Sequence, residues 1–574
     1  MKKSDFYWLP FLMVTLFLGV ILSSSRKNTS DLKQNKPNIL VILTDDMGYS
    51  DIGCFGSEIP TPHIDRLAYN GLRFTHFYNT GRCSPTRASL LTGLYPHQAG
   101  MGHLSTENHP QAGYIGDLSK NAVTLAEVLK NAGYSTFMTG KWHVAKENDY
   151  DGDKSNWPLQ RGFDRYFGTL NGSGSFFDPG TLTSGNTNIP PYKGFYYTSA
   201  ISDTTVKYIS ESPSNKPFFG YIAYTAAHWP LHAPADEIKK YKGFFDKGWD
   251  LLREQRFKRL KELGIIDDTY VLTDRGVSIP AWKDEPMKEW QVRRMEVYAA
   301  MIDVMDQGIG KIISALESKG VLDNTLIFYM HDNGGCAEPV GTDKMEIPLT
   351  EEQKVLKPYA YDSPNPDKKQ RYTREGKFIR MGKGVMPGDA DTWTGYNEEW
   401  ANVSNTPFRE YKQWVHEGGI ASPLVIHWPK GIKSKGQLRP HPSHLIDIMA
   451  TCLDISGIPY PKQFKDNNIQ PLEGKSLLPA FQNKPIDREY LFWEHGANRA
   501  IRVGDWKLVS KTSFNKTFSE ADEDKWELYN LIKDPTERID LREKNPEKAM
   551  AMIKLYREKA LYTKALPWPW KPKK

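Results

Sequence analysis

Residues 81–93, with the sequence GRCSPTRASLLTG, place a reactive side chain beside a positive charge. Pro85 suits the first turn of a helix, because the N–H group that proline lacks would be unpaired there anyway. Gly93 is a typical helix-ending residue, so we expect a helix that stops there. Cys83 then lies at the helix N-terminus, where free N–H groups and the helix dipole favour an anion. Arg87 follows one turn later. These residues predict a nucleophile next to an oxyanion-binding site.

A lone cysteine also has a simpler interpretation as a small buried hydrophobic residue. A cysteine-dependent phosphatase is a second alternative, but its arginine normally comes six positions after the cysteine rather than four. The complete string distinguishes these cases, because it resembles the signature of type I sulfatases at every fixed position, namely Cys83, Pro85, Arg87, Leu91, Thr92 and Gly93. In that family a formylglycine-generating enzyme oxidises the cysteine to formylglycine, whose hydrate is the nucleophile. The resemblance implies formylglycine at position 83.

Polar residues follow two strand-like segments. Residues 38–44 and 325–330 are short, mostly apolar runs, the pattern of strands buried on both faces. Because open α/β sheets bind ligands at the carboxyl ends of their strands, we expect the polar residues after each run to lie together. Three carboxylates and an amide suit Ca²⁺ better than Zn²⁺, with Mg²⁺ as an alternative. A solvated turn is the other interpretation of the first pair alone. The predicted metal ligands are Asp45, Asp46, Cys83 in its modified form, Asp332 and Asn333.

Two histidines and a lysine follow further strand-like segments. Residues 134–139 lead into G-K-W-H, which resembles the second motif of the sulfatase family. Lys141 then offers a charge to a sulfate oxygen, and His143 offers a hydrogen bond to the nucleophile. Residues 218–225 precede His228, which could protonate a leaving alkoxide. Considered singly, Lys141 and His143 fit ordinary loop residues better than catalytic ones, and His228 fits a core or turn histidine equally well.

Lys412 resembles the second sulfate-binding lysine of the family, ahead of the E-G-G turn at residues 417–419. The surrounding segment, NTPFREYKQWVHEGGI, looks most like bacterial arylsulfatases. Without the motif, Lys412 would be read as a solvated lysine. The resemblance thus implies a substrate-binding set of Lys141, His228 and Lys412, and a catalytic set of Cys83, Arg87, Lys141, His143, His228 and Lys412.

The N-terminal residues differ from the rest of the chain. Within residues 1–25, Lys2 and Lys3 precede an uncharged apolar run, and three serines follow it. This layout is typical of a secretory signal peptide and predicts export to the periplasm or beyond. The alternative is an uncleaved membrane anchor, because the run is near the lower length limit for a span. Residues 26–36 read as a polar linker.

The composition of 39% apolar and 25% charged residues is that of a soluble globular protein, and the net charge of +6 is small for 574 residues. That charge is spread along the chain, so it argues little for nucleic acid as a partner. Four cysteines are too few for a disulfide framework.

The resemblance covers residues 37 to about 541 and implies the α/β, alkaline-phosphatase-like fold of sulfatases, with a large mixed β-sheet between helices. We expect a catalytic domain at residues 37–480. Within it, residues 336–401 lack periodicity and form an insert near the active site, either shaping the substrate mouth or running over the surface. Four short β-like runs and a helical segment predict a small antiparallel sheet with one helix at residues 485–574.

The implied activity is hydrolysis of a sulfate ester, either a sulfated carbohydrate or an aryl sulfate. A covalent intermediate would split one difficult displacement into two easier steps. Two alternatives stay open. Related formylglycine enzymes cleave phosphonate monoesters or phosphodiesters, and a chain with unmodified Cys83 would be a non-catalytic oxyanion-binding protein.

Overall fold

Every side chain of strand β1 (Asn38–Thr44) is buried, as expected of an apolar run without polar alternation. Successive side chains point to opposite faces of the sheet. One hydrophobic core therefore receives Leu40 and Ile42, and the other receives Ile39, Val41 and Leu43. This description comes from a computed structural model, which describes residues 36–342, 344–365, 370–512 and 525–569. The predicted signal peptide lies outside the described residues, as does all but the last residue of the predicted linker.

Strand β1 belongs to an 11-stranded mixed sheet of order β10-β2-β9-β8-β1-β7-β3-β4-β5-β6, with β11 paired to β2. Strands β8, β1, β7, β3 and β4 are mutually parallel, whereas β9 and β5 run antiparallel to their neighbours. The predicted large mixed sheet is confirmed. Its other strands are β2 (Leu72–Tyr78), β3 (Ser135–Lys141), β4 (Arg165–Thr169), β5 (Leu182–Ser184), β6 (Thr187–Asn188), β7 (Phe218–Ala223), β8 (Thr325–His331), β9 (Ala421–His427), β10 (Gln437–Arg439) and β11 (Ser443–His444).

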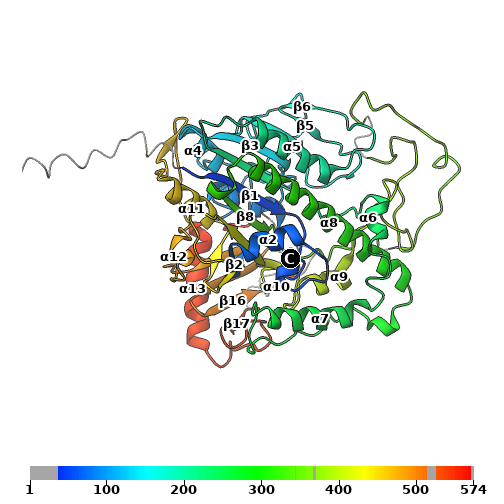
Figure 1. Ribbon diagram of the computed structural model, residues 1–574. Helices are drawn as coiled ribbons and strands as arrows, with labels where there is room; N and C mark the ends of the chain where they lie inside the picture. The colour runs from blue at the N-terminus through cyan, green and yellow to red at the C-terminus, as the bar shows by residue number, and fades with distance from the viewer. Residues whose placement is uncertain (1–35, 343, 366–369, 513–524, 570–574) are drawn as a thin grey trace, which may run out of the picture. The chain divides into compact units, whose positions relative to one another are not determined.

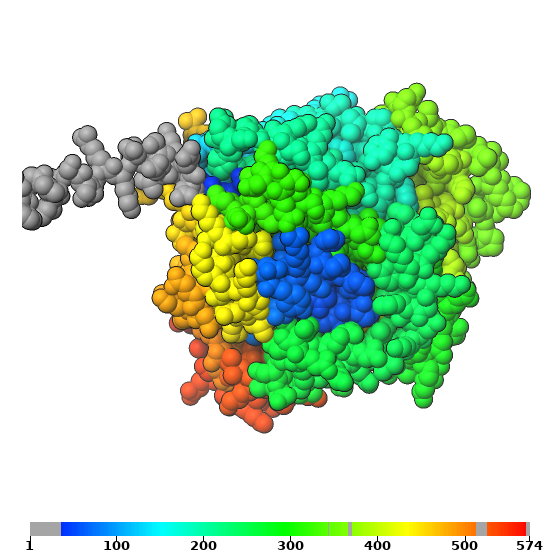
Figure 2. All heavy atoms as spheres, in the orientation of Figure 1, coloured from blue at the N-terminus to red at the C-terminus, as the bar shows by residue number. Residues whose placement is uncertain are grey.

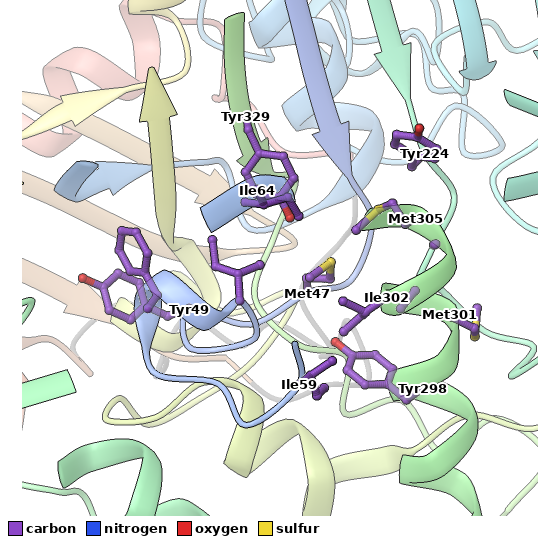
Figure 3. Packing of buried hydrophobic residues seen from close by; sticks show 14 of the residues in the cluster. Met47, Tyr49, Ile59, Ile64, Tyr224, Tyr298, Met301, Ile302, Met305 and Tyr329 are labelled. Carbon is purple, nitrogen blue, oxygen red and sulfur yellow. The ribbon is translucent and has the colours of Figure 1, made fainter. Parts of the chain in front are cut away.

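Helices cover both faces of this sheet (Figure 1). Helices α2 (Pro62–Tyr69), α5 (Tyr197–Glu211) and α8 (Lys288–Ser318) contribute to the core on one face. Helices α3 (Cys83–Thr92), α4 (Leu125–Asn131) and α11 (Asp447–Ser456) contribute to the core on the other. Figure 3 shows the first core, where side chains of α2 and α8 gather below β8.

Shorter elements complete the main part of the chain. They are the helices α6 (Ala235–Lys239), α7 (Gly248–Glu262), α9 (Asn397–Ser404), α10 (Glu417–Ile420) and α12 (Leu478–Phe481), the strands β12 (Gln463–Phe464) and β13 (Asn467–Asn468), and single 3-10 turns at Gly53–Phe55, Ala112–Tyr114, Trp282–Asp284 and Leu322–Asn324. Across the described ranges, none of the helices has the length and apolar character needed to cross a membrane.

The C-terminal part contains the predicted small antiparallel sheet. Its strands are β14 (Leu491–His495), β15 (Asn498–Val503), β16 (Trp506–Ser510) and β17 (Glu527–Asn530), in that order. Helix α13 (Pro546–Tyr562) packs on β14, β15 and β16. Both sheets belong to one compact unit, Asn38–Lys574. The division into two domains at residues 480–485 stays a prediction.

Buried ion pairs connect the C-terminal sheet to the E-G-G turn that precedes β9. Lys507 Nζ of β16 lies 2.7 Å from Glu417 Oε1 in the E-G-G turn and 2.8 Å from Glu537 Oε1. All three side chains are at most 5% exposed. The C-terminal sheet therefore braces the turn that follows Lys412.

Candidate active site

The carboxyl ends of four neighbouring parallel strands bring the predicted residues together. Asp45 and Asp46 directly follow β1, and Asp332 directly follows β8. Lys141 is the last residue of β3, and His228 lies five residues beyond β7. All of these side chains are buried. The arrangement matches the general rule that open α/β sheets bind ligands at the carboxyl ends of their strands.

Asp45 is held by two cations. Its Oδ2 atom accepts a hydrogen bond of 2.6 Å from Lys141 Nζ and one of 3.2 Å from a terminal nitrogen of Arg87. The same Arg87 nitrogen donates to Asp332 Oδ2 at 3.0 Å. The other terminal nitrogen of Arg87 donates to the carbonyl oxygen of Lys141 at 3.0 Å. Arg87 is therefore a positioning residue that fixes two carboxylates, and it is fully buried.

Asp46 forms a second set of contacts. Lys412 Nζ lies 2.7 Å from Asp46 Oδ1, and Asn333 Nδ2 donates to the same oxygen at 2.8 Å. His228 Nε2 lies 3.5 Å from Asp46 Oδ2. The backbone N–H of Asp46 donates to Asp332 Oδ1 at 3.2 Å. The four predicted polar ligands thus lie in one connected cluster.

The buried carboxylates differ in their ionisation. Burial opposes ionisation of Asp45, but Lys141 and the other nearby cations hold its pKa well below the usual range. Burial and the negative charge of Asp45 raise the pKa of Asp332 above its usual range. A divalent cation beside Asp45 and Asp332 would offset their mutual repulsion and favour the ionised form of Asp332.

The donor set fits a divalent cation. Asp45 Oδ1 and Asn333 Oδ1 are buried and have no hydrogen-bond partner among the described residues. One ligand atom each from Asp45, Asp46 and His228 lies within 4.8 Å of the other two. Buried oxygen atoms without partners are costly unless an ion or water satisfies them. Carboxylate and amide oxygens are the ligands that Ca²⁺ and Mg²⁺ prefer.

Cys83 is the first residue of α3, with Arg82 as the N-cap, so the predicted helix N-terminus is confirmed. It lines a cavity of about 350 Å³ together with His143, His228 and Lys412. The lining described by the structure includes neither Arg87 nor Lys141, which contact Asp45 instead. Four of the six predicted catalytic residues thus face the cavity directly.

The two histidines lie in fixed orientations. His228 Nδ1 is 2.6 Å from the carbonyl oxygen of Trp229, which can only accept, so Nδ1 carries a proton and Nε2 is the atom left for chemistry. Burial lowers the pKa of His228 to about 4. Burial, followed by Lys141 and Arg87, lowers the pKa of His143 well below its usual value. The ring of His143 packs against Gly172, where a Cβ atom added to the glycine would lie only 2.3 Å from the imidazole Cε1 atom.

Glu338 is a site residue that the sequence did not reveal. It lines the cavity from the start of the insert, and its Oε1 accepts a hydrogen bond of 2.8 Å from Arg82. Its Oε2 accepts from Trp229 Nε1 at 3.1 Å and lies 3.9 Å from Lys412 Nζ. Although burial opposes ionisation, Arg82 and Lys412 keep the pKa of Glu338 well below its usual range. A carboxylate six residues after Asp332 was the only available signal.

The insert contributes to two cavities. Glu338 lines the active-site cavity, whereas insert residues from 361–365 and 370–390 contribute to a second one. Figure 2 shows the light-green residues of the insert at the right-hand edge of the face drawn there. Cys54, Cys83, Cys336 and Cys452 are all free and buried.

Comparison with known proteins identifies the family. Residues 37–458 match the family described as Sulfatase, and residues 409–562 match the C-terminal region of N-sulphoglucosamine sulphohydrolase. An uncharacterized sulfatase of Schizosaccharomyces pombe is 32% identical over 545 residues, which cover 90% of this chain and 92% of that protein. An arylsulfatase of Klebsiella aerogenes is 32% identical over 461 residues, which cover 78% of this chain and 92% of that protein.

Solved structures share the fold. The crystal structure of Ps i-CgsB superimposes with a TM-score of 0.61 at 24% identity, over 93% of this chain and 94% of that chain. A second structure, which contains its substrate D-glucosamine-2-N,6-O-disulfate, gives a TM-score of 0.60 at 21% identity, over 93% of this chain and 100% of that chain. The predicted alkaline-phosphatase-like architecture is thereby confirmed. The chain belongs to the sulfatase family, and it is an enzyme of the sulfatase class.

Proposed function

We propose that this sulfatase hydrolyses a sulfate ester of a carbohydrate and releases inorganic sulfate, using formylglycine derived from Cys83 and a bound Ca²⁺ ion. The observation that carries the proposal is that Cys83 lines one cavity with His143, His228 and Lys412, beside a carboxylate cluster with two unpartnered oxygens. Relatives that include an N-acetylgalactosamine-6-sulfatase of Homo sapiens, 25% identical over 498 residues, support a carbohydrate substrate.

The formylglycine hydrate would supply an oxygen nucleophile for sulfur, and Ca²⁺, held by Asp45, Asp46, Asp332 and Asn333, would withdraw charge from the sulfate oxygens. Lys412 lines the cavity and adds a positive charge to its wall. Lys141 lies outside the cavity lining and acts through Asp45, whose Oδ2 atom is 2.6 Å from Lys141 Nζ. Fixed charges of this kind stabilise developing negative charge without reorganisation during the reaction.

His228 and His143 handle protons. The Nδ1 atom of His228 is committed to Trp229, so Nε2 is the atom that gives a proton to the departing alcohol oxygen. A bound sulfate ester brings a negative charge close to His228, which raises the pKa of the imidazole and favours its protonated form. His143, at the same cavity, accepts a proton from the hydroxyl group at position 83.

We also propose that the enzyme is exported, because residues 1–25 have the layout of a signal peptide. N-terminal sequencing of the mature protein tests this, with a new N-terminus near residue 26 as the expected result. An intact residue 1 in a membrane-bound protein would favour the anchor alternative.

The first experiment is mass spectrometry of the peptide that spans Cys83, from protein made together with a formylglycine-generating enzyme. We expect an aldehyde at position 83 and turnover of sulfate esters. Cys83→Ala should abolish turnover, whereas Cys452→Ala, another buried cysteine, should retain it. Parallel assays with an aryl sulfate, a phosphonate monoester and a phosphodiester separate the sulfatase from its alternatives. An unmodified thiol under conditions that convert a control protein would overturn the formylglycine mechanism.

A further inference from the structure

A second cavity of about 320 Å³ lies beside the active-site cavity. Ser173 lines the active-site cavity, and Ser175 lines the second one. Two residues of chain span at most roughly 7 Å, so the two linings come that close together. One wall of the second cavity consists of residues between Ser175 and Phe195, and the other consists of insert residues between Tyr361 and Ala390. The insert therefore shapes a space next to the site of reaction.

Five of the sixteen residues that line this cavity are aromatic. Tyr192 is 60% exposed, although it packs edge-on against the buried ring of Phe195 at a centroid distance of 5.3 Å. Tyr361 is 37% exposed, and its hydroxyl donates to Glu375 Oε1 at 2.7 Å. Tyrosine offers a broad, rigid contact surface at a low cost in conformational entropy. Exposed but supported tyrosine rings are thus well suited to bind a ligand ring.

The charges of the lining balance. Two acidic residues, Asp178 and Glu375, face two basic ones, Lys193 and Arg374. Arg374 donates to Asp178 Oδ1 at 3.0 Å, and Asp178 Oδ2 accepts from the hydroxyl of Tyr359 at 2.8 Å. The two buried charges of the lining, Asp178 and Arg374, are therefore paired with each other, whereas the other two, Lys193 and Glu375, are exposed. A second sulfate group would gain little here, whereas a neutral ligand rich in hydroxyl groups finds rings and hydrogen-bonding groups together.

We propose that this second cavity is a subsite for an uncharged sugar unit that is linked to the sulfated unit in the active site. The preferred substrate is then an oligosaccharide rather than an aryl sulfate or a sulfated monosaccharide. This inference rests on the proposed function for the identity of the reaction but not for the binding of the neutral sugar. Contacts with a remote, non-reacting unit supply binding energy that the reaction centre can use.

Binding is tested with the full-length Cys83→Ala variant, which cannot turn over, on an array of short neutral oligosaccharides. We expect at least one of them to bind. Adding Tyr192→Ala should weaken that binding by about tenfold, as is typical of an exposed aromatic anchor. The matched control is Tyr562→Ala, which removes a tyrosine that is 52% exposed on α13, and it should leave the affinity unchanged. Absence of binding by any oligosaccharide, or equal affinities for the two tyrosine variants, would overturn the subsite.

Kinetics give a second readout in the active enzyme. Tyr192→Ala should raise KM for the sulfated form of the bound oligosaccharide, while kcat/KM for an aryl sulfate stays unchanged. An equal loss for both substrates would overturn the subsite, because it would show a general structural defect. If no sulfate ester is hydrolysed but the neutral oligosaccharide still binds through Tyr192, the proposed function fails and the subsite stands.

Discussion

Lys412 Nζ contacts Asp46 Oδ1 at 2.7 Å, although 366 residues separate them in the chain. Asp46 belongs to the strand-end cluster, and Lys412 belongs to a loop that also lines the cavity. One carboxylate thus contacts both the candidate cation site and the lysine that lines the cavity. Glu338, 3.9 Å from Lys412, is the second acidic group in contact with that lysine.

Glu338→Gln should lower activity while retaining the fold. The variant replaces the carboxylate with an amide of similar size, which can still form hydrogen bonds but lacks the negative charge that faces Arg82 and Lys412. We expect kcat/KM to fall by roughly ten- to a hundredfold, the usual effect of removing a group that orients ligands at a charged site. Steady-state kinetics and a thermal melt measure the two effects. Glu351→Gln, at an exposed ion pair in the same insert, is the control and should change neither. Unchanged kinetics in the first variant would remove Glu338 from the site.

Gly172→Ala should displace His143. The added Cβ atom would lie 2.3 Å from the imidazole Cε1 atom, far inside van der Waals contact, so the ring must move. A shift of about 1 Å at a catalytic group can cost about a hundredfold in rate, and we expect a loss of that order in kcat. Gly174→Ala is the matched control, because the nearest atom to its added Cβ is Gln370 Oε1 at 3.8 Å. Equal rates for both variants would argue against a role of His143 in the rate-limiting step.

Much of the cluster could be predicted from the sequence, because buried parallel strands deliver their carboxyl ends to one edge of the sheet. The apolar runs before Asp45 and Asp332 marked those ends directly. Cys83 could be placed because proline and glycine mark the limits of its helix. The sequence could not show which of these residues line the cavity. Arg87 and Lys141 contact Asp45, whereas His143 and Lys412 face the cavity.

Glu338 and Gly172 escaped the sequence analysis for a physical reason. Both lie in irregular segments, where no periodicity relates a position to a direction in space. Arg409 shows the same limit. It lies only three residues before Lys412 in the sequence, but its guanidinium contacts Glu527 at 2.7 Å and Tyr529 at 2.9 Å in the C-terminal sheet. Long-range packing decides such positions.

Calcium should stabilise the protein independently of turnover. The cation would satisfy two buried oxygens and relieve repulsion among the aspartates, so the melting temperature of EDTA-treated Cys83→Ala protein should rise on addition of Ca²⁺. A concentration of about a hundred times Kd corresponds to about 2.7 kcal/mol of stabilisation. Differential scanning fluorimetry with Ca²⁺ and Mg²⁺ in parallel identifies the preferred ion.

The ligand set is tested in the same assay. Asn333→Ala should shift the Ca²⁺ midpoint upward by roughly tenfold or more, in line with the loss of other groups at metal sites. Asn131→Ala, at an exposed position at the end of α4, should leave the midpoint where it is. A melting temperature that does not respond to either ion would contradict the predicted cation site.

Lys507→Met should destabilise the fold in a pH-dependent way. The substitution leaves the carboxylates of Glu417 and Glu537 buried without their cation, which typically costs about 3–5 kcal/mol. Although burial opposes ionisation, Lys507 lowers the pKa of Glu537 below 4.5, so this stabilisation is fully present above pH 4.5 and is lost as the pH falls through the folded-state pKa. The difference in the free energy of unfolding between the wild-type protein and Lys507→Met should therefore be largest at neutral pH and become smaller in acid.

Chemical denaturation at several pH values measures this gap. Lys511→Met is the control. Lys511 is 42% exposed and forms an ion pair with Glu410, and exposed pairs contribute about 1 kcal/mol or less. A constant gap from neutral to acidic pH would mean that the loss reflects packing rather than charge.

All ten residues of α3 are buried, including Cys83 at its first position. If Cys83 is oxidised to formylglycine, as we propose, an enzyme that binds the chain on both sides of the cysteine would find these residues buried in the native fold. The oxidation would then have to precede folding. The length of time for which the nascent chain stays open would set the fraction of active molecules, and a batch purified in the thiol form could be rescued only through denaturation and renewed folding.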